Sequence, residues 1–306
     1  MSMVLAGAPA PSYAIAVDAR RENFRLIRRS MLIASGLCLL KALTGLATGS
    51  LGVLASALDS CMDLCSSAVN FVSLKIALAP ADAEHPYGHG KAEPLAGLFQ
   101  GAFIAIGGLG LLAEALRRFF SGASLEHGAW GAAVMLVSTL LSAFHGARLR
   151  RAARESGSTV MAAEGAHYAV DVASNLGVAA ALLLSQYGGG PLWDLAVTVL
   201  VAGYVLKASI PILLSSVSEL MDEGLAQPVR LEIERLIQSH HPAIVGFHQF
   251  RARRAGSRRY IELHVEIAGV TDFRQAHDIA ESLTLRIQES VPDSEVLIHY
   301  DPEGAD

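Results

Sequence analysis

The sequence predicts an α-helical membrane domain of six transmembrane helices, followed by a cytoplasmic α+β domain with the element order αββαβ. Of the 306 residues, 52% are hydrophobic and only 17% are charged, whereas soluble domains carry about 25% charged residues. Long stretches between Met31 and Leu220 carry almost no charge, and the chain from Asp222 onward is rich in Arg, Glu, Asp and His. This uneven distribution indicates a membrane half and a soluble half.

Six apolar segments are long enough to be transmembrane helices, because a bilayer-spanning helix needs about 20 mainly apolar residues. They cover roughly residues 29–49, 52–79, 95–118, 129–149, 162–186 and 192–216. We therefore expect a flexible N-terminal tail at 1–24, a six-helix transmembrane domain at 25–220 and a cytoplasmic domain at 221–306.

The basic residues near the ends of these segments predict the orientation. Arg25, Arg28 and Arg29 precede the first segment, Lys91 lies in the second link, and the fourth link is arginine-rich. Cytoplasmic loops carry an excess of Lys and Arg, so both termini are expected in the cytoplasm. Arg117 and Arg118 lie on the other side but are outnumbered.

The soluble part alternates helical and strand patterns. Residues 226–239 have a helical pattern, residues 246–255 and 258–269 alternate as strands do, and residues 294–301 read as a third strand. Residues 272–290 form an amphipathic helix with Asp272 as its N-cap. In the second strand, Ile261, Leu263, Val265 and Ile267 face one way and Tyr260, Glu262, His264 and Glu266 the other. We expect a small sheet with both helices on one face.

Two of the apolar segments carry a pair of metal-binding side chains. Asp59 and Asp63 in the second segment, and His167 and Asp171 in the fifth, are each four residues apart and share a helix face. A carboxylate in hydrocarbon costs roughly 2.5–3.5 kcal/mol on insertion scales, and no Lys or Arg nearby in those segments offsets it. Facing each other, the pairs suit tetrahedral Zn²⁺. The mixed ligands disfavour Cu(I) and leave Fe²⁺, Mn²⁺, Co²⁺ and Cd²⁺ open.

Further histidines lie outside the apolar segments. His85 and His89 flank a Pro-Tyr-Gly turn in the second link, and Asp82 precedes them by three residues. By themselves they also fit a solvated turn. The cysteines Cys61 and Cys65 are out of phase with the Asp59 and Asp63 stripe, so we do not expect them to bind metal.

Together these motifs resemble the cation diffusion facilitator family, and within it the bacterial zinc/iron efflux branch. The resemblance rests on Asp59-xxx-Asp63, His85-Pro-Tyr-Gly-His89-Gly-Lys91, His167-xxx-Asp171 and the αββαβ tail, and it covers the chain from about Arg25 to Pro302. It implies a homodimer in the lipid bilayer that exports a divalent transition metal in exchange for protons. The fourth link has no histidine-rich insert, which favours the inner membrane of a bacterium.

The resemblance also implies three metal sites. The transport site would be formed by Asp59, Asp63, His167 and Asp171, a set similar to that of zinc and cadmium carriers. A loop site would use Asp82, His85 and His89. The cytoplasmic domain would bind metal through His248, His264, His277, His299 and Asp301.

A mechanism follows from the chemistry of these ligands. A metal ligand must be deprotonated, so protons compete with the metal for the site. We expect a Zn²⁺/H⁺ antiporter that works by alternating access, with Zn²⁺ also bound in the cytoplasmic domain. We further expect Lys91 and Asp222 to pair and couple the two halves of the chain.

Several alternatives stay open on the sequence alone. The same fold could be specialised for Fe²⁺ or Mn²⁺, act as a metal sensor that does not transport, or function in a heterodimer. An intramembrane enzyme is disfavoured, because the His-Glu-x-x-His motif of zinc proteases is absent. The net charge of −5 gives no reason to expect nucleic acid binding.

Overall fold

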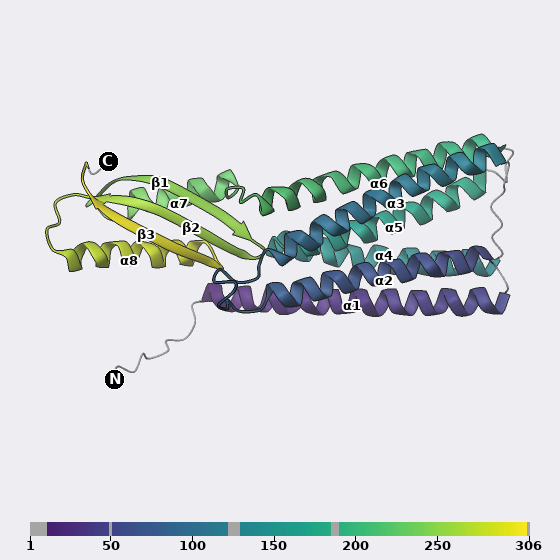
Figure 1. Cartoon of the computed structure of the whole chain (residues 1–306), viewed down its shortest axis with the longest axis horizontal. Helices are drawn as coiled ribbons and strands as arrows, with labels where there is room; N and C mark the ends of the chain where they lie inside the picture. Colours follow the sequence, from purple (N-terminus) through teal and green to yellow (C-terminus); the bar gives the residue numbers. More distant parts are fainter. Residues whose placement is uncertain (1–10, 49–50, 122–128, 185–189, 305–306) are drawn as a thin grey trace. The chain divides into compact units, whose positions relative to one another are not determined.

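The computed structural model describes residues 11–48, 51–121, 129–184 and 190–304 (Figure 1). The chain divides into two compact units. One is the helical unit Arg21–Val217, and the other contains Ser218–Asp306. We describe each unit separately.

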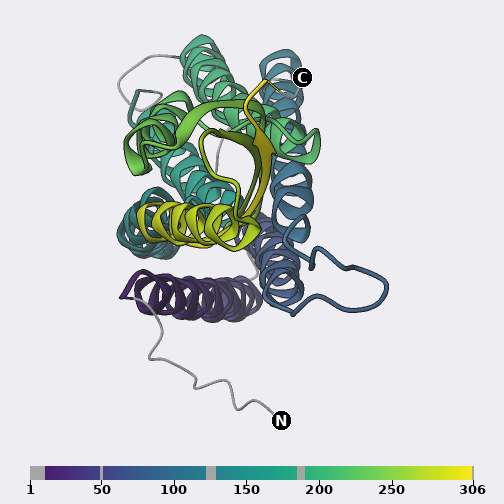
Figure 2. The ribbon, with the colours of Figure 1, turned by 90° about the vertical axis from the view of Figure 1, so that its left-hand side faces the viewer.

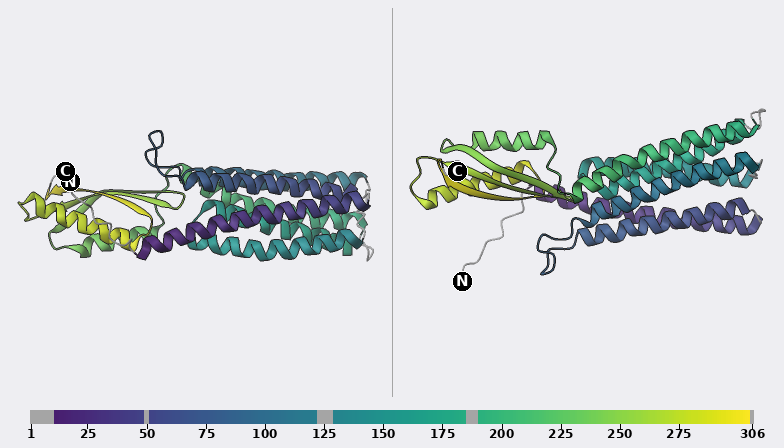
Figure 3. Two further views of the ribbon diagram at one scale, coloured as in Figure 1. Left: turned by 90° about the horizontal axis from the view of Figure 1, so that it is seen from below. Right: turned by 45° about the horizontal axis from the view of Figure 1, so that its top comes forward.

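The helical unit is built from long helices that run alongside one another (Figure 3). They are α1 (Pro11–Thr48), α2 (Leu51–Ala77), α3 (Ala92–Ser121), α4 (Ala129–Ser156), α5 (Thr159–Leu184) and α6 (Gly190–Leu220). Helix α1 begins at Pro11. Residues 11–24 are therefore helical, whereas the sequence analysis expected a flexible tail there. Proline is well tolerated at the first helical position, and no Gly or Pro interrupts residues 12–24. Residues 1–10 lie outside the described part of the chain.

The expected six membrane spans are confirmed only in part. In the described residues, three helical stretches are long and apolar enough to cross a bilayer: Glu22–Ala47, Ala92–Ser121 and Leu195–Leu220. Helices α2 and α5 carry the acidic and histidine side chains, and α4 ends in an arginine-rich turn. Membrane spans at α2, α4 and α5 stay a prediction.

Helices α4 and α5 pack closely because two glycines lie at their contact. A Cβ atom at Gly146 would lie 2.9 Å from the Cβ of Tyr168, and one at Gly165 would lie 3.1 Å from the backbone nitrogen of Arg150. Small residues allow helix backbones in membranes to approach one another. This contact supports α5, the helix that carries His167.

A buried polar contact joins three helices next to this glycine pair. His145 of α4, to which the sequence assigned no role, is 3% exposed, and its Nε2 lies 2.8 Å from the Oγ of Ser30 of α1. Its ring packs edge-on against Tyr168 of α5 at 5.1 Å between centroids. Tyr168, which follows His167 in the sequence, is therefore packed against α4 through the His145 ring.

The second unit has the predicted αββαβ order. Its elements are α7 (Gln227–His240), β1 (Ile244–Ala255), β2 (Arg258–Ile267), α8 (Phe273–Ser290) and β3 (Ser294–Pro302). The strand order is β1-β2-β3; β2 pairs antiparallel with β1 and parallel with β3. As predicted, Asp272 is the N-cap of α8, where its side chain accepts a hydrogen bond from the backbone nitrogen of Arg274 at 2.9 Å.

The core of this unit confirms the predicted alternation in the second strand. Both helices and the inner face of β2 contribute apolar side chains to it. The buried members include Ile233, Ile237, Ile261, Leu263, Val265, Ile267, Ile279, Leu283 and Ile287. On the other face of β2, Glu262 is exposed and His264 and Glu266 are half-buried. The polar face of the sheet is therefore free to carry a site.

Candidate metal centres

The first candidate site lies between α2 and α5 and contains most of the predicted transport set. The Nε2 atom of His167 lies 3.1 Å from Oδ1 of Asp63 and 4.0 Å from Oδ2 of Asp171. Ligand atoms of these three residues lie within 4.8 Å of one another. The His167 side chain is 7% exposed, and its Nε2 forms no hydrogen bond with another described residue. The cluster thus offers one imidazole and two carboxylates to a cation.

The fourth predicted member, Asp59, lies on α2 four residues before Asp63. Its side chain is outside the described part of the chain. Because residues four apart share a helix face, the expectation that Asp59 joins the cluster stays a prediction.

The cluster opens into a cavity of about 350 Å³. Polar side chains from several helices line it together with the cluster: Lys41, Ser60, Ser138, Ser142, Ser174 and Asn175. Asn175 follows Asp171 by four residues and continues its helix face, as the sequence indicates. Lys41 of α1 was missed, because the absence of Lys and Arg near the metal-binding pairs of the second and fifth segments says nothing about a neighbouring helix.

A second polar group that the sequence analysis missed lies beside this cluster. Glu164 of α5 is fully buried and accepts hydrogen bonds from Ser67 Oγ at 2.6 Å and Asn70 Nδ2 at 2.5 Å, both on α2. Glu164 precedes His167 by three residues, and this spacing was a signal that could have revealed it. The hydrogen bonds join α2 to α5, the two helices that carry the cluster.

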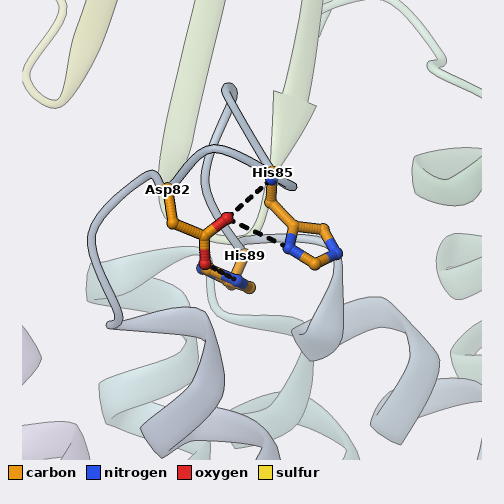
Figure 4. A group of neighbouring side chains, drawn as sticks. All are labelled: Asp82, His85 and His89. Atoms are coloured by element: carbon orange, nitrogen blue, oxygen red, sulfur yellow. Dashed lines mark hydrogen bonds and ion pairs between the residues drawn. The ribbon is translucent and has the colours of Figure 1, made fainter.

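The second candidate site is the loop between α2 and α3, which extends outward from the ends of these helices (Figure 2). Asp82 lies between the two predicted histidines (Figure 4). Its Oδ1 is 3.3 Å from His85 Nδ1, and its Oδ2 is 3.3 Å from His89 Nε2. The two imidazole rings are 4.6 Å apart. The structure therefore brings all three predicted residues of this site together.

Backbone hydrogen bonds in this loop stabilise the ionised form of Asp82, the form that can bind a cation. The backbone nitrogens of His85 and Glu84 donate to Oδ1 of Asp82 at 2.7 and 3.0 Å. The bond from His85, with the charge of His89, holds the pKa of the Asp82 carboxyl below its usual range. The buried Nδ1 of His89 has no hydrogen-bond partner among the described residues. An ionised carboxylate and an unpartnered imidazole nitrogen fit a divalent metal.

The third candidate site crosses the three-stranded sheet in a single row. His248 of β1 is in register with His264 of β2, and His264 is in register with His299 of β3. The ring centroids are 5.1 Å apart for the first pair and 4.7 Å for the second. Adjacent strands place in-register side chains on the same face, so the three imidazoles form one row.

Asp301 joins this row from β3. Its Oδ2 accepts a hydrogen bond from His264 Nδ1 at 2.9 Å and lies 3.3 Å from His248 Nε2, and its Oδ1 is 3.1 Å from His299 Nε2. The hydrogen bond from His264 and the nearby imidazoles lower the pKa of the Asp301 carboxyl. Three imidazoles around one carboxylate are a ligand set that suits Zn²⁺.

Two predicted residues have other neighbours within the chain. His277 of α8 lies 3.4 Å from Glu281 and groups with the exposed Asp278 and Glu281 of that helix. Asp222, predicted to pair with Lys91, lies 3.1 Å from Arg253 Nη1 in its own unit. Lys91 belongs to the helical unit, and the two units are described separately. Pairing between Lys91 and Asp222 stays a prediction.

Apolar helices with a buried His/Asp cluster, joined to a small α+β unit with its own His/Asp cluster, define a membrane protein that handles metal cations. The model of the cation efflux transmembrane domain matches residues 27–221, and that of the cation efflux protein cytoplasmic domain matches residues 226–303. The chain therefore belongs to the cation efflux family, the cation diffusion facilitators.

Relatives support this assignment over most of the chain. The cation-efflux pump FieF of Shewanella oneidensis is 37% identical over 276 residues, covering 90% of this chain and 92% of the relative. The pump FieF of Serratia proteamaculans is 34% identical over 285 residues, covering 91% and 93%. A solved chain of CzrB, described as a candidate zinc transporter, is 28% identical over 26% of this chain and all of its own, with a TM-score of 0.26.

Proposed function

We propose that this cation efflux protein exports Zn²⁺ from the bacterial cytoplasm in exchange for protons. Asp59, Asp63, His167 and Asp171 would bind the transported ion. The observation that carries the proposal is the approach of His167 Nε2 to carboxylate oxygens of Asp63 and Asp171 inside a cavity of the helical unit. Four ligands of this kind suit tetrahedral Zn²⁺, and the imidazole makes the site softer than an all-oxygen site for Mn²⁺.

Proton exchange follows from the same ligands. The imidazole must be neutral and the carboxylates ionised to bind metal. Protons entering from the more acidic side would therefore displace Zn²⁺. The protonated site would then be exposed again to the cytoplasm, where it releases the protons. The sequence has no continuous polar stripe through all six segments, which disfavours an open channel, so the protein would expose the site alternately to each side.

The loop site (Asp82, His85 and His89) and the histidine row (His248, His264 and His299, with Asp301) would have roles on the cytoplasmic side. We propose that the cytoplasmic domain joins two copies into a homodimer in the inner membrane, with both termini in the cytoplasm, and that zinc bound by the histidine row favours one arrangement of the two copies. Pairing of Lys91 with Asp222 would couple the two units. Additive effects of Lys91→Ala and Asp222→Ala on flux in a double-mutant cycle would reject that pairing.

Flux into liposomes tests the proposed function. The purified protein is reconstituted with a zinc-sensitive dye inside and an imposed pH gradient, and Zn²⁺, Fe²⁺, Mn²⁺ and Cd²⁺ are supplied in turn. We expect gradient-dependent zinc flux that Asp171→Ala abolishes. Glu114→Gln is the matched control, because Glu114 is also acidic and intramembrane but pairs with Arg117 and does not line the cavity.

Each outcome of this experiment has a clear meaning. Flux of another metal without zinc would show that the site selects Fe²⁺ or Mn²⁺. Zinc binding without flux in the wild type would favour a sensor that does not transport. Flux that persists in Asp171→Ala would remove this residue from the transport site.

A further inference from the structure

Lys41 is a basic side chain inside the helical unit, and neither the fold nor the metal cluster accounts for it. It lies on α1, lines the same cavity as Asp63, His167 and Asp171, and its Nζ donates a hydrogen bond to Ser60 Oγ at 2.8 Å. Ser60 is 2% exposed. An ionisable side chain within a membrane helix is costly and is usually paired or functional.

The charges around the cavity indicate what Lys41 does. Among the described residues that line it, Asp63 and Asp171 are acidic, and Lys41 carries the sole amino group on a side chain. Lys41 and Asp171 line the same cavity, and a positive charge there stabilises a nearby carboxylate. Without metal, the positive charge of Lys41 offsets part of the negative charge of the two carboxylates.

We propose that Lys41 is a tethered cation of the transport site, which stabilises the carboxylates when no metal is bound and lowers the affinity of the site for a divalent cation. This inference rests on the proposed transport function. The ammonium attracts the carboxylates and repels a divalent cation, so it stabilises the empty site more than the loaded one, and both interactions are strong where water is scarce. Lys41 would thereby favour release of the ion and limit how tightly the carrier holds its substrate.

A purely structural role makes a different prediction. If Lys41 serves only to join α1 to α2 through Ser60, its removal should loosen the helices and weaken metal binding. Ser60→Ala removes the same hydrogen bond and keeps the charge, so it separates the two roles.

Zinc affinity provides the test. The parent protein for this test is the full chain with His85→Ala, which disables the loop site, and His264→Ala, which disables the histidine row. Zinc binding is measured by calorimetry for this parent and for four variants made in it: Lys41→Met, Lys41→Gln, Lys41→Arg and Ser60→Ala. We expect both neutral variants to bind Zn²⁺ about tenfold or more tightly, because a repulsive charge has been removed. Lys41→Arg and Ser60→Ala should stay close to the parent. Two neutral variants are used in case one fails to fold.

The outcomes separate this inference from the proposed function. Unchanged or weaker zinc binding in the folded neutral variants overturns the role of Lys41, whether or not the wild type transports zinc. If the neutral variants bind Zn²⁺ more tightly but the wild type shows no zinc flux, the role of Lys41 in metal affinity is supported and the transport function is rejected. Absence of zinc binding in the parent with both other sites disabled overturns both. In flux assays, the neutral variants should show a lower half-saturating zinc concentration and a lower maximal rate, because release is slowed.

Discussion

His167 Nε2 on α5 lies 3.1 Å from Asp63 Oδ1 on α2. This contact joins two pairs of metal-binding residues that are far apart in the sequence. Helices α2 and α5 are also joined by the hydrogen bonds that Ser67 and Asn70 donate to Glu164. The geometry of the imidazole therefore depends on buried polar contacts as well as on its own backbone position.

The imidazole of His167 should set the preference for zinc. His167→Asp replaces the nitrogen ligand with an oxygen ligand, and oxygen-only sites suit Mn²⁺ better than Zn²⁺. We expect the ratio of zinc to manganese affinity to fall about tenfold or more, a change of about 1.4 kcal/mol or more in relative binding free energy. Competition between the two metals in the liposome flux assay measures it. An unchanged ratio, with Glu114→Gln as the control, would show that geometry and not ligand type sets the selectivity.

Asp301 should make the cytoplasmic domain sensitive to acid. Its pKa is lowered, chiefly by the hydrogen bond from His264. A carboxyl with a lowered native pKa stabilises the fold above its unfolded pKa of about 3.9, and this contribution is lost as the pH falls through the native value. The protection of the β2 and β3 amides from hydrogen exchange, measured in the full chain relative to the intrinsic rate at each pH, should therefore fall below about pH 4 in the wild type.

The variant Asp301→Asn removes this titrating group, so the same amides should lose protection at neutral pH and change less between pH 5 and 3. Asp278→Asn on the exposed surface of α8 is the control and should behave as the wild type does. Equal pH profiles for Asp301→Asn and the wild type would mean that the histidine row draws no stability from this carboxylate.

The contact between α4 and α5 should tolerate no side chain at Gly146. Gly146→Ala places a Cβ 2.9 Å from that of Tyr168, and overpacking of this kind costs about 1–3 kcal/mol. Gly110→Ala is a matched helical control with open space around the new atom, and it should be neutral or stabilising by up to about 1 kcal/mol because alanine favours helix. Melting temperatures of the detergent-solubilised proteins measure both. Equal shifts in the two variants would contradict the close packing inferred at Gly146.

The repeated patterns of the chain were readable because they are local. The i, i+4 spacing places His167 and Asp171 on one face of a helix, and alternation places Ile261 and Leu263 inside the sheet whatever surrounds them. These patterns predicted the αββαβ order and the two pairs of metal-binding side chains in the membrane segments, whereas the loop group and the cytoplasmic group came from the resemblance to the cation diffusion facilitators. They did not predict the start of α1 at Pro11, because a polar helical segment has no apolar pattern.

The sequence by itself determined which helix faces and strand faces carry His and Asp, since local backbone geometry decides the direction of each side chain. Only the tertiary structure decided which of these faces meet. It brought Lys41 of α1 into the cavity that Asp63 and Asp171 line, and it placed Glu164 within hydrogen-bond distance of Ser67 and Asn70. These neighbours are set by the packing of distant segments, and packing depends on the combined shape and charge of many side chains that no local spacing encodes.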